Sequence, residues 1–143
     1  MRPLFAASTL MLLSACSTLP DPDPNQAWVD LTPVDETSLH AVQVDERDWA
    51  DTRYFEVAPG SHELTVRYQF PVTPSNIGPV NEPLWRDCQL NLTFKDFSAG
   101  QRYQLQAGSI GFRPWVKLYD HQQKLLGLQL WQCSGQINGK LAV

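Results

Sequence analysis

The sequence predicts an all-β domain, folded as an antiparallel sandwich of two sheets with about seven strands. Two observations lead to this prediction. Short segments in which apolar and polar residues alternate recur along the chain, as they do in strands that are buried on one face only. Turn sequences rich in proline, glycine and serine separate these segments, and no stretch has a convincing 3.6-residue periodicity. Several short strands joined by such turns are typical of a sandwich.

The sequence predicts one strand and one hairpin in the first half of the folded domain. Residues 39–44 (LHAVQV) form a plausible strand, and residues 62–70 (HELTVRYQF) have the most regular alternation in the chain. One face of the second segment carries four apolar side chains: Leu64, Val66, Tyr68 and Phe70. A strand-like stretch precedes it, and Pro59 followed by Gly60 suits a type II turn between the two. We therefore expect a hairpin over residues 52–70.

Two further hairpins are expected downstream. Residues 88–94 (CQLNLTF) alternate with Cys88 on the apolar face, and a turn at residues 98–101 leads to a return strand. The last hairpin joins residues 115–119 to residues 126–131 through a polar stretch. In its second strand three leucines alternate with glycine and glutamine: Leu126, Leu128 and Leu130. These leucines are expected to share one face.

The first fifteen residues have the features of an export signal. Arg2 supplies positive charge, and the uncharged apolar run at residues 4–13 is far shorter than the roughly 20 residues that span a bilayer as a helix. The sequence Leu13-Ser14-Ala15-Cys16 resembles the lipobox of bacterial lipoproteins, in which the cysteine is acylated and the signal is cleaved just before it. The alternative is an ordinary secretory signal whose cleavage site borders a cysteine.

The lipobox resemblance implies an anchor and a division of the chain. Acylated Cys16 would hold the protein at a membrane, because several acyl chains together anchor stably. In that family an aspartate after the cysteine favours the inner membrane; Ser17 therefore implies the outer membrane, on its periplasmic side. We expect a signal peptide over residues 1–15, an acylated cysteine and Pro/Asp tether over residues 16–26, and one sandwich domain over residues 27–143.

Length and charge limit the function classes. Removing the signal leaves 128 of the 143 residues, which is enough for one domain with a core. Arg2 is the only charged residue lost, so the formal net charge changes from −4 to −5. An acidic domain without clusters of lysine and arginine lacks the electrostatic features of a nucleic-acid binder. We expect membrane contact through the lipid anchor and no nucleic-acid partner.

Two cysteines remain once Cys16 is assigned to the anchor. Cys88 and Cys133 lie in an exported domain, where disulfides form and persist. We expect a bridge between them; two buried free thiols are the alternative. In the chain-entropy model, a bridge between residues 88 and 133 raises the free energy of unfolding by about 3–4 kcal/mol.

The turns of the domain resemble those of small envelope lipoproteins with a transthyretin-like or PEGA-like sandwich. The likeness spans about residues 40–126 and includes a PG-x-H motif at residues 59–62 and a G-x-x-Y motif at residues 100–103. It implies a transthyretin-like or Ig-like sandwich. Most of that family has no assigned chemistry, so the resemblance transfers no catalytic residue.

No constellation of catalytic or metal-binding residues is visible. His40, His62 and His121 lie on separate segments, and no HExxH or CxxC pattern occurs. Ser109 lies in a glycine-rich stretch that only superficially resembles a nucleophile elbow. We expect no metal, no cofactor and no enzymatic activity.

The segment over residues 71–87 is the leading candidate for a contact surface. It is rich in proline, long for a sandwich connection, and ends in Trp85 and Arg86, residue types enriched in binding hot spots. The alternative is a solvated crossover between the sheets. The sequence thus predicts a non-catalytic, lipid-tethered sandwich that contacts another envelope or secretion-apparatus component.

A small-ligand binding module is the competing prediction. Trp115 and Trp131 lie in adjacent predicted strands, where two exposed, coplanar rings would stack on a cell-wall glycan or peptide. Cross-strand packing of the two rings is the simpler explanation.

Overall fold

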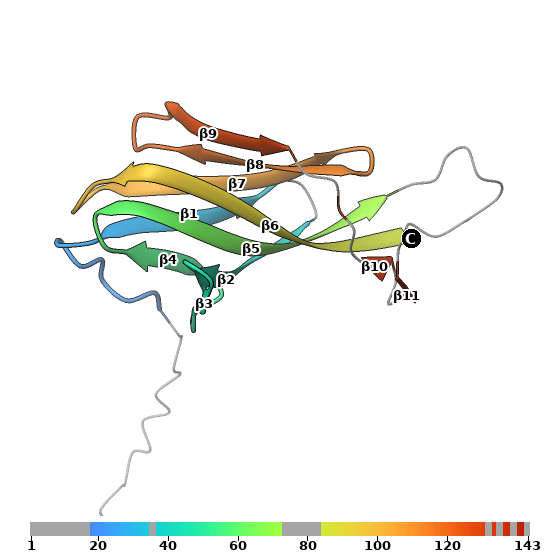
Figure 1. Ribbon diagram of the computed structural model, residues 1–143, viewed down its shortest axis with the longest axis horizontal. Coiled ribbons are helices and arrows are strands. Elements are labelled where there is room, and N and C mark those ends of the chain that lie inside the picture. The colour runs from blue at the N-terminus through green and yellow to red at the C-terminus, as the bar shows by residue number, and fades with distance from the viewer. Residues whose placement is uncertain are drawn as a thin grey trace, which may run out of the picture.

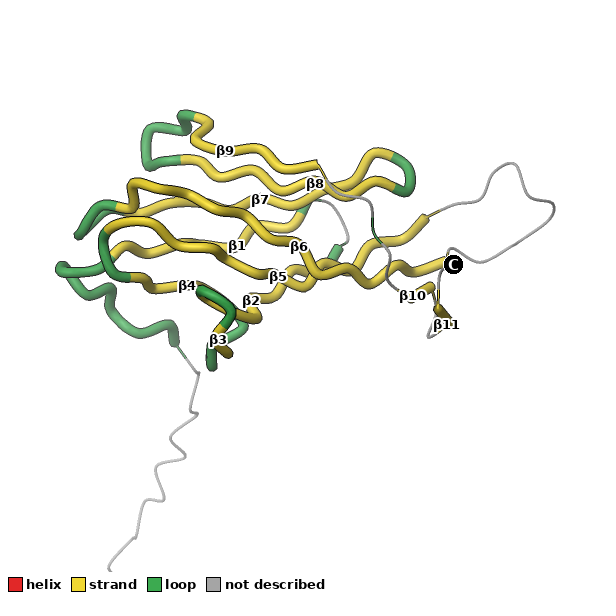
Figure 2. The backbone as a smooth tube through the Cα atoms, viewed as in Figure 1, coloured by secondary structure: helices red, strands yellow, loops and turns green. Residues whose placement is uncertain are grey.

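The computed structural model describes residues 18–34, 37–72, 84–130, 133, 136–137 and 140–141. Over these residues all regular structure is strand, in two sheets that face each other (Figure 1, Figure 2). The predicted all-β sandwich is therefore confirmed. Within the described part of the chain, no helix is long and apolar enough to cross a membrane. The expected signal and Cys16 lie outside the described residues.

The first sheet has the strand order β4-β1-β7-β8-β9. Its strands are β1 (Ala27–Pro33), β4 (Tyr54–Val57), β7 (Arg102–Ile110), β8 (Arg113–Tyr119) and β9 (Leu125–Leu130). Among them β1 and β7 run parallel, with Trp28 opposite Arg102 and Pro33 opposite Ala107, whereas the other neighbours are antiparallel. The domain thus contains a parallel pair that the sequence did not predict.

The second sheet has the strand order β11-β10-β6-β5-β2-β3. Its strands are β2 (Ser38–Val44), β3 (Arg47–Asp48), β5 (Gly60–Val72), β6 (Leu84–Phe97), β10 (Gln136–Ile137) and β11 (Lys140–Leu141). The two long strands β5 and β6 pair along their whole length, from Gly60 opposite Phe97 to Val72 opposite Leu84. Their alternate side chains form much of the core, where Tyr68, Phe70 and Leu90 are almost completely buried.

Two of the three expected hairpins are wrong. Strand β4 lies in the first sheet and β5 in the second, so Pro59 and Gly60 carry the chain between sheets, with Gly60 at the expected positive φ of 115°. The turn at residues 98–101 likewise leads from β6 to β7 in the other sheet. Alternation identifies a strand but not its partner, and a short turn also spans the ~10 Å between packed sheets. The third hairpin, β8 with β9, is confirmed.

The strand directions define two ends of the sandwich. Residues 18–26, the described part of the expected tether, lead into the start of β1, beside the turn that contains Gly100, whose amide donates to the Gln26 carbonyl at 2.9 Å. We call this the tether end. Because β7 runs parallel to β1, Ile110 lies about 26 Å further along the strand direction than Arg102, at ~3.3 Å per residue. This opposite end, the distal end, also holds the β7–β8 turn and the start of β6 (Figure 1).

Candidate functional site

A disulfide joins Cys88 on β6 to Cys133, with 5.5 Å between the two Cα atoms. The expected pairing is therefore confirmed. Cys88 is buried on the inner face of the second sheet, and Cys133 packs against the core. The bridge thus fastens the chain that follows β9 to the distal half of β6.

Trp85 and Arg86 do not form one surface. Arg86 lies two residues before buried Cys88 in β6, so its side chain is on the same, inner face of the sheet. Trp85 lies on the outer face, with 45% of its surface exposed. Arg86 donates through Nη2 to the Cys133 carbonyl at 2.6 Å, and its guanidinium lies 5.8 Å from the Phe112 ring centroid. Arg86 therefore ties the β7–β8 turn to Cys133, while Trp85 faces outward.

The segment over residues 71–87 is not a crossover between sheets. It connects β5 and β6, which are neighbours in the second sheet, and both of its ends belong to these strands. Pro71 pairs with Trp85 across the two strands. Residues 73–83 lie outside the described residues, so the predicted contact role of that stretch stays a prediction.

Trp115 is half-buried on the outer face of the first sheet. Its ring covers Gly108, the residue opposite it on β7, so closely that a Cβ atom added at Gly108 would overlap the indole. The Lys117 Nζ lies 4.6 Å from the centroid of the same ring. Packing within the sheet therefore accounts for Trp115. Trp131 lies outside the described residues, and the expected pairing of the two rings is not decided.

Large apolar side chains are exposed at the distal end and along β9. At the distal end these are Ile110 (72% exposed) and Phe112 (47% exposed) on the β7–β8 turn, which we call the distal patch, and separately Trp85 on the outer face of β6. Ile110 and Phe112 flank Gly111 at the tip of the β7–β8 turn, where Gly111 has a φ of 61°. This turn cannot be recognised as a contact surface from the sequence, because two isolated apolar residues beside a glycine give no periodic signal.

The leucines of β9 are arranged differently from the predicted alternation. An irregularity in the pairing with β8 turns Gly127 inward, where its Cα faces Leu92, and leaves Leu128 (49% exposed) and Leu130 (67% exposed) in solvent. Leu126 is partly buried against the core. A bulge of this kind shifts the faces of a strand by one residue and is not visible in the sequence pattern.

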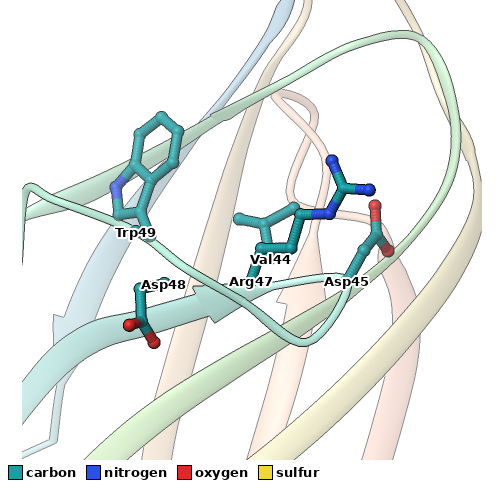
Figure 3. Close-up of a pocket in the computed structure, with 5 residues that line it drawn as sticks. All are labelled: Val44, Asp45, Arg47, Asp48 and Trp49. Atoms are coloured by element: carbon teal, nitrogen blue, oxygen red, sulfur yellow. The ribbon is translucent and has the colours of Figure 1, made fainter.

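A hollow of about 470 Å³ lies beside the β2–β3 turn (Figure 3). Three of its side chains are already engaged: Asp45 accepts from the Glu63 amide at 2.9 Å, Asp48 accepts from Gln43 at 3.2 Å, and the Trp49 indole donates to the Tyr54 carbonyl at 2.7 Å. The Glu63 amide, with a further bond from His62, holds the pKa of Asp45 below its usual value. These hydrogen bonds therefore have a structural role, which is to hold the β2–β3 turn in place.

His62 fastens the sheet-crossing segment to that turn. Its Nδ1 lies 2.6 Å from Asp45 Oδ2, and its Nε2 lies 2.7 Å from the Ala58 carbonyl. The contact gives the PG-x-H motif a structural reason, since Pro59 and Gly60 turn the chain and His62 holds the turn in place. His62 is thus locally hydrogen-bonded.

A second hollow, of about 310 Å³, lies on the outer face of the first sheet and includes Asp30, Arg102 and His121. Asp30 accepts from Arg102 at 2.6 and 3.0 Å and from the Trp28 indole at 2.9 Å. Burial raises the pKa of Asp30, but the bonds from Arg102 and Trp28 outweigh it, so this pKa lies below its usual value. Among the residues that the structure describes, no group of three or more His, Cys, Asp and Glu is placed to hold a metal ion.

No family model, curated protein or solved structure matches this chain. The surfaces described above are therefore interpreted from their own geometry.

Proposed function

We propose that this protein is a non-catalytic docking module of the bacterial cell envelope, tethered by acylated Cys16 and binding a protein partner through its distal patch. The observation that supports this role is the exposure of Trp85, Ile110 and Phe112 at the end opposite the tether. Large apolar side chains exposed at one end of a domain favour a contact surface there, and tryptophan is enriched among the residues that dominate binding energy.

The placement of the two ends suits this role. Acylation at Cys16 holds the tether end near the periplasmic face of the outer membrane, and the chain from the tether enters the first sheet at Ala27. The distal patch then faces away from that membrane, toward components of the periplasm. An envelope or secretion-apparatus protein is the class of partner that this direction favours.

The shape of the distal patch favours a protein over a small ligand. Small molecules bind in concave pockets that surround most of their surface, whereas Ile110 and Phe112 project from a turn. The aromatic face required by the ligand-binding alternative is weakened at Trp115, because Gly108 and Lys117 already pack against its ring. We therefore place the ligand-binding role second.

Photo-crosslinking from the distal patch tests the proposed function. A photoreactive phenylalanine analogue at position 112 should give a discrete protein adduct in intact cells, because this ring is exposed at the distal end. The matched control places the analogue at Thr93, which is exposed on the outer face of β6 in the second sheet. An Ile110→Ser substitution should reduce the yield from position 112. Equal adducts from positions 112 and 93 would contradict a distal docking surface.

A further inference from the structure

Strand β9 is an open edge of the first sheet. It pairs with β8 on one side, and no strand of the described residues pairs with its other side (Figure 1). Its sequence, LLGLQL, contains neither a charge nor a proline. Soluble proteins normally protect edge strands with charges, proline, short length or a covering segment, since an open edge is a template for another strand.

The other edges at the ends of the two sheets are protected. Strand β4 carries Glu56, and the Asp23 amide of the tether donates to this carboxylate at 3.1 Å. Strand β3 has two residues only, Arg47 and Asp48, both charged. Strand β6 pairs with β10 at Arg86 and Asp87 and contacts β9 further along. Among the described strands longer than two residues, β9 is the edge that lacks these devices.

An apolar strip borders this edge on the outer face of the sheet. Leu130 lies opposite Trp115, and Leu128 lies opposite Lys117, so these four side chains share one face of the β8–β9 pair. Leu128 and Leu130 are each about half exposed or more. A strand added beside β9 would cover both leucines with its own alternate side chains.

The charges beside the strip are cationic. Lys117 lies over the Trp115 ring, and Lys124 immediately precedes β9. The carboxylate in the β8–β9 turn, Asp120, is directed into the turn, where its Oδ1 accepts from the amides of Gln122 and Lys124 at 2.9 Å each. A partner strand with acidic residues near the two lysines therefore complements this surface.

We propose that β9 is a strand-addition site for an extended segment of a partner protein, with apolar side chains beside Leu128 and Leu130 and with acidic residues at its two ends, where the positive charges of Lys117 and Lys124 favour them. The inference rests on the proposed docking function and adds a mode of binding to it. Main-chain hydrogen bonds to the open edge supply affinity, and the leucines and lysines supply selectivity.

Peptide binding to the full chain, purified in detergent, tests this site. The probe is a fluorescent ten-residue peptide in which valine alternates with threonine between two glutamates at each end, and its counterpart has lysine in place of glutamate. In fluorescence anisotropy the acidic peptide should bind at least tenfold more tightly. Hydrogen exchange should show that the peptide slows the exchange of β9 amides, as main-chain pairing requires.

Three variants and one control make the test specific. Leu128→Asn and Leu130→Asn remove apolar contact without adding charge and should each weaken binding of the acidic peptide at least tenfold, and both positions are exposed enough to keep the fold. The paired change Lys117→Glu with Lys124→Glu should reverse the preference toward the lysine peptide. Thr93→Asn, on the other sheet, should leave binding unchanged and serves as the matched control.

Several results would overturn the strand-addition site: binding of neither peptide, binding that Leu128→Asn does not affect, or β9 amides that stay unprotected. A dimer in analytical ultracentrifugation that Leu128→Asn weakens would also overturn it, because a second copy of the chain would then occupy the edge. If crosslinking from position 112 succeeds while these tests fail, the docking function stands and only the β9 inference is lost.

Discussion

At the scale of single residues, the outer faces of both sheets are held by pairs of aspartate and arginine. Asp87 accepts from Arg67 Nε at 2.8 Å and from Gln69 at 3.1 Å, and Asp30 is held by Arg102. The bonds from Arg67, followed by the bond from Gln69, keep the pKa of Asp87 below its usual value despite partial burial. These carboxylates stabilise the folded state while they are charged.

Acid should remove the contribution of Asp87 to the stability of the folded protein. A carboxylate with a lowered pKa in the folded protein stabilises it above its unfolded value of about 3.9, and this stability is lost as the pH falls through the folded value. Asp87→Asn should therefore reduce the free energy of unfolding at pH 7 by up to about 1 kcal/mol, since the pair is partly exposed. Urea unfolding at pH 7 and near pH 2 measures the difference. If Asp87→Asn lowered the free energy of unfolding equally at both pH values, charge would not be the cause.

At the scale of elements, the strands could be predicted from alternation but their partners could not. The alternation of Leu64 to Phe70 identified β5, whereas nothing in Pro59 and Gly60 distinguishes a hairpin turn from a crossing between sheets. Strand β1 was missed because Trp28 is buried on the outer face, stacked on Tyr54 at 4.1 Å between ring centroids. Tertiary contacts of this kind conceal the period of two.

The residues of the candidate surfaces could likewise be predicted from the sequence only in part. The count of cysteines and the expected compartment were sufficient to predict the Cys88–Cys133 bridge, and residue type alone pointed to Trp85. Arg86 was paired with Trp85 because the two are adjacent in sequence, although adjacent strand residues point to opposite faces. The position of Ile110 and Phe112 at a turn depends on where β7 ends and β8 begins. The glycines near this point obscure both strand boundaries in the sequence.

The contact between Gly108 and Trp115 should limit substitution in the β7–β8 pair. Gly108→Ala places a methyl group where the indole lies, so we expect a loss of about 1–3 kcal/mol in the free energy of unfolding. Gly127→Ala is the matched control: its Cβ would lie 3.5 Å from Leu92 Cδ1, an ordinary contact, so stability should change little. Urea unfolding compares the two. Adding Trp115→Val to Gly108→Ala should restore part of the loss, and no restoration would exclude the overlap as the cause.

At the scale of the whole molecule, the two chain segments that flank the sandwich are fixed at opposite ends. The tether is bound through Gln26 and Asp23 near the start of β1. The chain after β9 is bound through Cys133, which the disulfide and Arg86 hold at the distal end. The orientation of the domain on a membrane would therefore be set at Cys16 and the tether.

The anchor is tested on the intact protein in cells. Cys16→Ala should prevent acylation and move the protein from the membrane to the soluble periplasmic fraction, because the acyl chains provide its membrane affinity. Ser17→Asp is the matched control and should keep the protein in the membrane fraction, with retention at the inner membrane. Cell fractionation and immunoblotting distinguish the two variants. A Cys16→Ala protein that still sediments with membranes would contradict the lipobox interpretation.

The parallel pairing of β1 with β7 has a mechanical consequence. If the membrane holds the tether and a partner holds the distal end, a pull between them runs along the strands. The hydrogen bonds that join β1 to β4 and β7 lie across this direction, so they bear the load together in shear. Extraction of β1 then requires many bonds to break at once, instead of one after another. This arrangement suits a protein that must remain folded while it links two structures that move apart.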